Sequence, residues 1–149
     1  PAYIVMPQLT AGRWSDRVDT VYALVSELAT QFQIDPASIS LTGHSLGGSG
    51  AWELAAAFPG FFSRVAPLSG AVFPTEENLA ALSQTEVWAF VGSADTIIEP
   101  EYSLEFAQQL EVTGGNVAVT VLEGADHFDV PGLAYLNEDY GLPDWLIGK

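Results

Sequence analysis

Short apolar runs alternate with longer amphipathic segments along the whole chain. The runs have the length of strands and are bounded by proline, glycine or polar residues, as buried strands are. They are Ala2–Met6, Ser38–Thr42, Val65–Leu68, Val87–Val91 and Val117–Leu122. Buried strands separated by helices favour a parallel sheet, because each parallel connection needs a crossover. The pattern predicts an α/β fold, a three-layer α/β/α sandwich with a mostly parallel sheet of about five strands.

Apolar residues at helical spacing fill the segments between these runs. The expected helices run from about Asp16 to Phe32, from Ser45 to about Phe58, from a Thr75 cap through Leu82, and from Pro100 to about Glu111. The tail, up to Ile147, is expected to form a packing helix. Because no internal repeat or linker interrupts the pattern, residues 1–149 are interpreted as a single domain.

The composition narrows the classes of function. The chain has 19 acidic and 4 basic residues, and its net charge of -15 opposes binding to nucleic acid and disfavours strongly anionic substrates. No apolar run reaches the roughly 18 residues of a membrane span, so we expect no membrane insertion. The sequence has no cysteine and only His44 and His127, so we expect neither a metal nor a cofactor. Few basic residues and many small ones indicate an extracellular or cell-surface location.

The motif Gly43-His44-Ser45-Leu46-Gly47 lies where a predicted strand meets an alanine-rich helix. This context is typical of a nucleophile elbow, a sharp turn that holds the serine in a strained backbone conformation. The N-terminus of the helix would then favour the negative charge that develops on a reacting carbonyl. We expect Ser45 to be the nucleophile and the backbone N–H of Leu46 to be one oxyanion donor. The alternative is a purely structural turn.

A base and an acid follow in the order expected of such a site. His127, in the loop after the last predicted strand, is the candidate base, and Asp95, after the strand 87–91, is the candidate orienting acid. Asp126 and Asp129 lie nearer to His127 in sequence and are the rival acids. Ser45, Asp95 and His127 all follow predicted parallel strands, so their side chains should meet at one edge of the sheet.

The chain resembles the α/β-hydrolase superfamily. The stretch from Ile34-Asp35-Pro36 through Gly43–Gly48 to Ala66–Gly70 resembles serine esterases of the polyhydroxybutyrate-depolymerase and feruloyl-esterase type, which are secreted, and Val87–Asp95 and Gly124–His127 fit the same pattern. The resemblance implies a carboxylesterase that forms an acyl-enzyme on Ser45, with His127 as base and Asp95 as orienting acid.

One part of that family pattern is missing. Such sheets usually have an earlier strand, followed by a His-Gly loop that supplies the second oxyanion N–H, and this chain has no His-Gly pair. The missing strands of the full fold are either upstream or in a separate piece, or Ala2–Met6 closes the gap and pairs with Ser38–Thr42. The second oxyanion donor therefore has no assigned residue. An open strand edge would invite a partner segment or a second copy of the chain.

Only the segment from about Ser69 to Glu86, enough for one helix, separates the elbow region from the acid-bearing strand. We therefore expect a lidless, open site for small-molecule or, better, bulky or polymeric ester substrates. The candidate substrate contacts are His44, Trp14, Ile97 and Phe128. A peptidase, thioesterase or acyltransferase would use the same triad. From another class, the chain would be a catalytically weak or inactive interaction domain.

Overall fold

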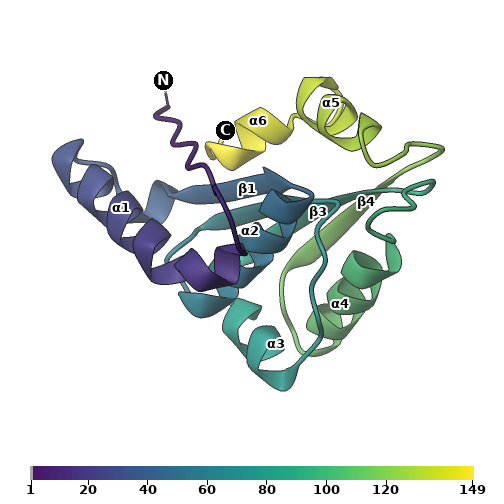
Figure 1. Cartoon of the computed structure of the whole chain (residues 1–149), viewed down its shortest axis with the longest axis horizontal. Coiled ribbons are helices and arrows are strands. Elements are labelled where there is room, and N and C mark those ends of the chain that lie inside the picture. Colours follow the sequence, from purple (N-terminus) through teal and green to yellow (C-terminus); the bar gives the residue numbers. More distant parts are fainter. Residues whose placement is uncertain (1) are drawn as a thin grey trace.

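A parallel sheet forms the centre of the computed structural model, which describes residues 2–149 (Figure 1). Within these residues the sheet has four strands, β1 Ser40–His44, β2 Arg64–Leu68, β3 Glu86–Gly92 and β4 Val117–Leu122. The strands follow one another in the order β1-β2-β3-β4, and each neighbouring pair is parallel. All strands therefore end at the same edge, where the predicted site residues follow them.

Helices cover both faces of this sheet, which confirms the predicted three-layer α/β/α sandwich. One layer contains α1 Val18–Gln31, α2 Leu46–Ala57, α3 Glu76–Leu82 and α4 Glu101–Val112, and the other contains α5 Asp129–Leu136 and α6 Leu142–Leu146 (Figure 1). Two short 3-10 helices, η1 Trp14–Arg17 and η2 Pro36–Ser38, precede α1 and β1. None of the helices within residues 2–149 is both long and apolar enough to cross a membrane.

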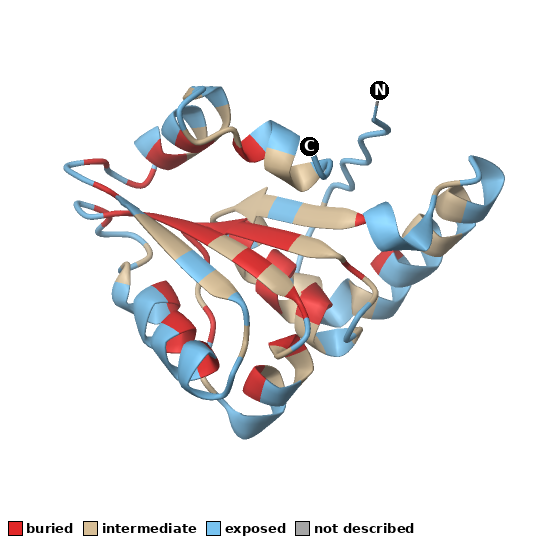
Figure 2. Cartoon of the chain, turned by 180° about the vertical axis from the view of Figure 1, so that it is seen from behind, coloured by how far each residue is buried: buried red, intermediate tan, exposed pale blue. Residues whose placement is uncertain are grey.

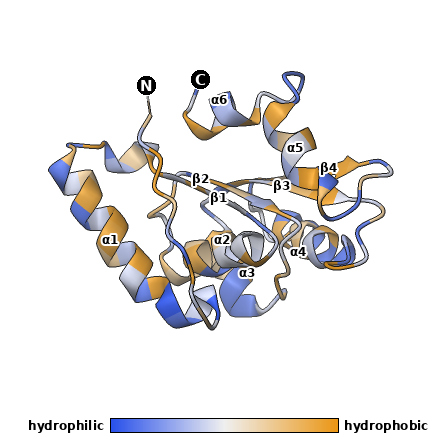
Figure 3. Ribbon diagram, turned by 45° about the horizontal axis from the view of Figure 1, so that its top comes forward, coloured by the Kyte–Doolittle hydropathy of each residue, from blue (hydrophilic) through white to orange (hydrophobic). Residues whose placement is uncertain are grey.

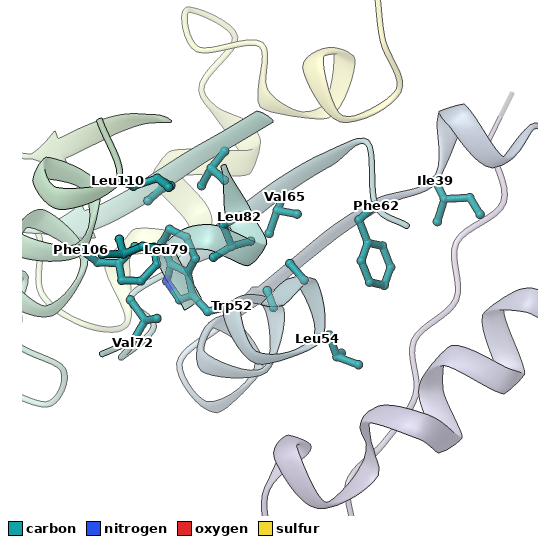
Figure 4. Close-up of a cluster of buried hydrophobic side chains, with 14 of the residues drawn as sticks. Ile39, Trp52, Leu54, Phe62, Val65, Val72, Leu79, Leu82, Phe106 and Leu110 are labelled. Atoms are coloured by element: carbon teal, nitrogen blue, oxygen red, sulfur yellow. The ribbon is translucent and has the colours of Figure 1, made fainter. Parts of the chain in front are cut away.

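The two faces of the sheet have separate hydrophobic cores. The larger core lies under α2, α3 and α4 (Figure 4), where the rings of Trp52 and Phe106 are 4.9 Å apart and both side chains are fully buried. The smaller core lies under α5 and α6 and includes Leu68, Phe90 and Leu142. Figure 2 shows that burial is concentrated in the central strands, and Figure 3 shows hydrophobic and hydrophilic residues alternating along α1. The sheet is therefore held from both sides.

Three predicted boundaries differ from the structure for local reasons. The helix expected from Asp16 begins with the 3-10 turn η1, and α1 starts at Val18. The strand expected from Ser38 starts at Ser40, because Pro36–Ser38 forms a turn whose Ala37 N–H donates to the Asp35 carboxylate. The expected tail helix is divided into α5 and α6, and Gly141, with φ 60°, is the N-cap of α6.

The predicted strand Ala2–Met6 is wrong. The segment has no regular secondary structure, and Tyr3, Ile4 and Met6 are 66%, 81% and 83% exposed. An apolar run becomes a strand only where another strand offers it hydrogen bonds, and none does so here. The segment instead contacts the C-terminal end of α1, where the Tyr3 ring stacks on the C-cap residue Phe32 at 4.7 Å. Ala2–Met6 thus does not pair with β1, and the sheet has four strands rather than about five.

Candidate active site

Ser45 lies on a sharp turn between β1 and α2. Its backbone has φ 57° and ψ -119°, a region that residues with a side chain rarely adopt. Its N–H donates to Leu68 O of β2 at 2.9 Å, which attaches the turn to the sheet. A Cβ atom at Gly48 would lie 2.4 Å from the same carbonyl oxygen, so only glycine lets α2 approach β2 this closely. The elbow predicted from the sequence is therefore present.

The three residues of the predicted triad lie together at the carboxyl edge of the sheet. The Nε2 atom of His127 is 2.8 Å from Ser45 Oγ, and its Nδ1 atom is 2.7 Å from Asp95 Oδ2. Both His127 and Asp95 are 4% exposed. Their loops follow β4 and β3, and Ser45 follows β1. Such a chain of hydrogen bonds can withdraw a proton from the serine hydroxyl as it attacks a carbonyl carbon.

The Asp95 carboxylate is held in its ionised form. Burial by itself would raise its pKa, but hydrogen bonds from the Ile98 N–H, the His127 ring and the Ile97 N–H together lower the pKa below its usual value. The two backbone N–H groups donate to Oδ1 at 2.9 Å each, which leaves Oδ2 for the imidazole. The loop thus presents a fixed, charged acceptor to His127.

The rival acids Asp126 and Asp129 bond to the backbone of their own loop. Asp126 Oδ1 accepts the N–H groups of Phe128 and Asp129, and Asp129 Oδ2 accepts the N–H of Asp126. These contacts shape the turn that carries His127, while the imidazole itself bonds to Asp95. Sequence adjacency does not bring these two carboxylates to the ring.

Leu46 is the first residue of α2, where backbone N–H groups have no partner in the preceding turn. Its side chain is 50% exposed. This is the position from which its N–H can donate to an oxyanion formed at Ser45. The second oxyanion donor still has no assigned residue within residues 2–149.

The four candidate substrate contacts lie in different settings. Ile97 and Phe128 are 56% and 75% exposed beside the triad, and the Phe128 ring meets the His127 ring edge-on at 5.4 Å. Trp14 packs instead against Gly50 of α2 and the larger core. The Nε2 atom of His44 is 2.8 Å from the backbone carbonyl of His127. Ile97 and Phe128 are therefore open to solvent beside the triad, whereas the contacts of Trp14 and His44 are internal.

A solvent-open hollow of about 440 Å³ adjoins the acid of the triad. Its lining residues are Ser93, Asp95, Thr96, Glu99, Pro100 and Glu101. Glu99 and Glu101 lie just before and at the start of α4, and the folding of the β3–α4 loop brings both to this hollow. Within residues 2–149, no group of three or more histidine or acidic side chains is arranged to hold a metal ion.

The sequence and the fold are similar to those of known hydrolases. The sequence profile of the dienelactone hydrolase family matches residues 2–133. No curated protein matches the chain in sequence. Among solved structures, a thermostable esterase is 25% identical with a TM-score of 0.79, and the match covers 88% of this chain and 36% of that one.

Two further structures share the fold. Esterase PE8 is 20% identical with a TM-score of 0.70, over 93% of this chain and 66% of that chain. An alpha-beta serine hydrolase homologue from Coxiella burnetii is 19% identical with a TM-score of 0.68, over 95% of this chain and 64% of that chain. The chain thus spans between 36% and 66% of the lengths of these three structures.

Proposed function

The chain belongs to the dienelactone hydrolase family, and we propose that this α/β-hydrolase is a serine carboxylic-ester hydrolase that uses Ser45 as its nucleophile. The observation that carries the proposal is the continuous hydrogen-bonded series from Ser45 Oγ through both nitrogens of His127 to Asp95. The esterases among the similar structures support an ester as the substrate, since one of them reaches 25% identity over 88% of this chain.

In the proposed reaction, Ser45 Oγ attacks the carbonyl carbon of the ester while His127 Nε2 accepts the hydroxyl proton. Asp95 stabilises the resulting imidazolium, and the Leu46 N–H donates to the oxyanion. The tetrahedral intermediate collapses when the ester C–O bond breaks, and His127 gives its proton to the departing alcohol. Water, deprotonated by His127, then attacks the acyl-enzyme, and the carboxylic acid leaves as Ser45 regains its proton.

The proposed substrates are bulky or polymeric esters without strong negative charge. Between β2 and β3 the chain forms only α3, of residues Glu76–Leu82, so this connection holds no large lid. Ile97 and Phe128 offer exposed apolar contacts beside the triad. Glu99 and Glu101 line the neighbouring hollow, and their charges disfavour an anionic acyl or alcohol group there.

Replacing the nucleophile tests the proposal directly. We expect Ser45→Ala to reduce turnover of p-nitrophenyl acetate and butyrate by about 10³-fold or more, because nothing else in the triad can form the acyl-enzyme. A fluorophosphonate probe should label the wild type once per chain, and the variant not at all. Unchanged ester turnover in pure Ser45→Ala protein would disprove the proposal. Circular dichroism of both proteins controls for folding.

A panel of leaving groups distinguishes the related reactions. A peptidase, a thioesterase and an acyltransferase would use the same three residues. We compare an oxygen ester, a thioester and an anilide of the same acyl group. We expect the oxygen ester to be hydrolysed fastest. Faster turnover of the thioester would instead indicate a thioesterase, and faster turnover of the anilide would indicate a peptidase. An alcohol acceptor that diverts most of the acyl group would instead favour a transferase.

The alternative from another class is an inactive interaction domain. It is favoured by the edge of β1, which is the end strand of the sheet, and by the exposed apolar residues near Ile4. An unpaired edge and an apolar segment together can recruit a partner segment or a second copy. Failure of the probe to label Ser45, with a dimer or complex seen by light scattering, would support this alternative.

The proposed extracellular or cell-surface location is tested by fractionation of the source cells.

A further inference from the structure

Three alternate residues of β1 attach this strand to the C-terminal part of the chain. Ser40 Oγ donates to Leu146 O at 2.6 Å, and His44 Nε2 lies 2.8 Å from His127 O. Between them, Thr42 Oγ1 donates to Ala66 O at 2.7 Å and accepts a hydrogen bond from the Tyr135 hydroxyl. Alternate residues of a strand point to the same face. We call the side chains of Ser40, Thr42 and His44 the polar seam.

The His44 contact differs from the other two because it reaches the base of the triad. A backbone carbonyl can only accept a hydrogen bond, so His44 Nε2 carries the proton and donates it to His127 O. The two imidazole rings are 4.6 Å apart. Burial lowers the pKa of His44, and this effect outweighs the opposite effect of the hydrogen bond to the His127 carbonyl. His44 is therefore a neutral donor near neutral pH.

The loop that carries His127 is attached to its two neighbours in different ways. On the side of the acid, Gly124 N–H donates to Ser93 Oγ at 2.8 Å and Ala94 N–H donates to Ala125 O at 3.0 Å. On the side of the nucleophile, the contact from His44 is the one hydrogen bond within residues 2–149 between the main chain of this loop and the end of β1. The first two bonds hold the loop against the acid-bearing loop, and the His44 bond holds it against the end of β1.

We propose that His44 is a positioning residue, which holds the His127 backbone so that Nε2 stays within hydrogen-bond distance of Ser45 Oγ. The inference rests on the proposed function of the triad and gives His44 a different role from substrate contact. A base that moves away from the serine hydroxyl transfers the proton more slowly, whereas the open substrate site is unchanged. Loss of the donor should therefore lower kcat and leave KM nearly constant.

Two amide variants provide the sharpest test. The amide of His44→Gln can replace the Nε2 donor, whereas His44→Asn has the same amide on a side chain one methylene shorter, which does not reach His127 O. We expect His44→Asn to lower kcat about tenfold, the effect of one lost hydrogen bond, with KM within about twofold. His44→Gln should keep at least about half of the wild-type kcat.

The neighbouring contact of the seam supplies the matched control. Thr42→Val removes the hydroxyl that bonds to Tyr135 but keeps the shape of the side chain. We expect it to lower the unfolding midpoint while kcat stays within about twofold of wild type, because the hydrogen bonds of Thr42 go to Ala66 and Tyr135 rather than to the His127 backbone. Equal kcat losses in Thr42→Val and His44→Asn would show a general structural effect and overturn the proposal. A rise in KM at constant kcat in His44→Asn would instead show substrate contact and also overturn it.

A measurement without turnover separates this proposal from the proposed function. The NMR signal of the His127 Nε2 nitrogen, which bonds to Ser45 Oγ, can be followed directly, and the rate of fluorophosphonate labelling reports on Ser45. We expect the Nε2 signal to broaden in His44→Asn and to persist in His44→Gln and Thr42→Val. A signal that is the same in all four proteins would overturn the proposal. If the wild type hydrolyses no ester, the proposed function fails, and the Nε2 signal still decides the role of His44.

Discussion

Two serines at the edge of the sheet have backbone conformations that usually favour glycine. Ser45 has φ 57° and Ser69, at the end of β2, has φ 43°. A non-glycine residue in this region costs about 1–3 kcal/mol and persists only where its surroundings fix it. Hydrogen bonds from Ser45 N–H to Leu68 O and from Ser69 N–H to Phe90 O supply that support. The strained turn at Ser45 places Oγ 2.8 Å from His127 Nε2 at the start of α2.

The ionised Asp95 should make stability depend on pH. The pKa of Asp95 is lowered in the folded state, so its contribution to stability is complete above the ordinary aspartate pKa of about 3.9. The contribution is lost as the pH falls through the lower, folded-state pKa. We expect Asp95→Asn to reduce the free energy of unfolding clearly at pH 7 and by a shrinking amount below about pH 4. Urea unfolding of both proteins at several pH values measures this difference.

The matched control for that prediction is Asp126→Asn. Asp126 lies in the loop of the base but is exposed, so solvent screens its charge and the effect of its replacement should be small. A difference between wild type and Asp95→Asn that grows on acidification would contradict the predicted direction.

Because α2 lies so close to β2, alanine substitutions at two neighbouring glycines should have different effects on stability. A Cβ at Gly48 would lie 2.4 Å from Leu68 O and 3.0 Å from Gly70 Cα, whereas a Cβ at Gly47 would meet nothing within 4 Å. Gly48→Ala should destabilise the protein by about 1–3 kcal/mol, because the helix must move away from the strand. Gly47→Ala should be neutral or stabilise by up to about 1 kcal/mol, since alanine favours the helix. Chemical unfolding measures both.

Activity gives a second test of the same close approach. The carbonyl oxygen that Gly48→Ala would displace also accepts the N–H of Ser45. The substitution should therefore slow labelling by a fluorophosphonate, and Gly47→Ala should do so much less. Equal stability of the two variants would mean that the packing of α2 on β2 adjusts without cost.

The elements with a local signal were predicted well. Thr75 accepts the Asn78 N–H as the predicted cap of α3, and the predicted strands Val87–Val91 and Val117–Leu122 agree closely with β3 and β4. Their apolar residues pack on both faces of a sheet, so pattern and burial agree. Ala2–Met6 has the same kind of pattern but no neighbour to bond with, and its structure is therefore irregular. Periodicity reports which residues avoid water, whereas pairing depends on residues elsewhere in the chain.

At the scale of the whole molecule, negative charge is the dominant electrostatic feature. The net charge is -15, and within residues 2–149 the Arg64–Glu86 pair, at 3.2 Å, is the one ion pair between an arginine or lysine and a carboxylate. Repulsion among so many acids destabilises the compact state, and salt screens it. We therefore expect added sodium chloride to stabilise the fold.

The size of the salt effect can be bounded. If screening of the acidic charges raises the free energy of unfolding by about 1 kcal/mol, the unfolding midpoint of a domain of this size should rise by about 2–4 °C between low salt and 0.5 M sodium chloride. A thermal scan by circular dichroism in a salt series measures the shift. A midpoint that falls with salt would mean that attractive charge pairs outweigh the repulsion among acids.

The sequence by itself determined the fold class and the positions of the candidate site residues. The alternation of apolar runs and helices specifies a parallel sheet, and residues that follow its strands must meet at one edge, so Ser45 and His127 could be named in advance, with Asp95, Asp126 and Asp129 as the candidate acids. Their catalytic roles remain proposals. Only the tertiary structure decided that Asp95, rather than Asp126 or Asp129, bonds the imidazole. It also decided that Ala2–Met6 stays unpaired and that His44 faces the His127 backbone. These outcomes depend on contacts between distant segments, which follow from how the layers pack and leave no trace in local spacing.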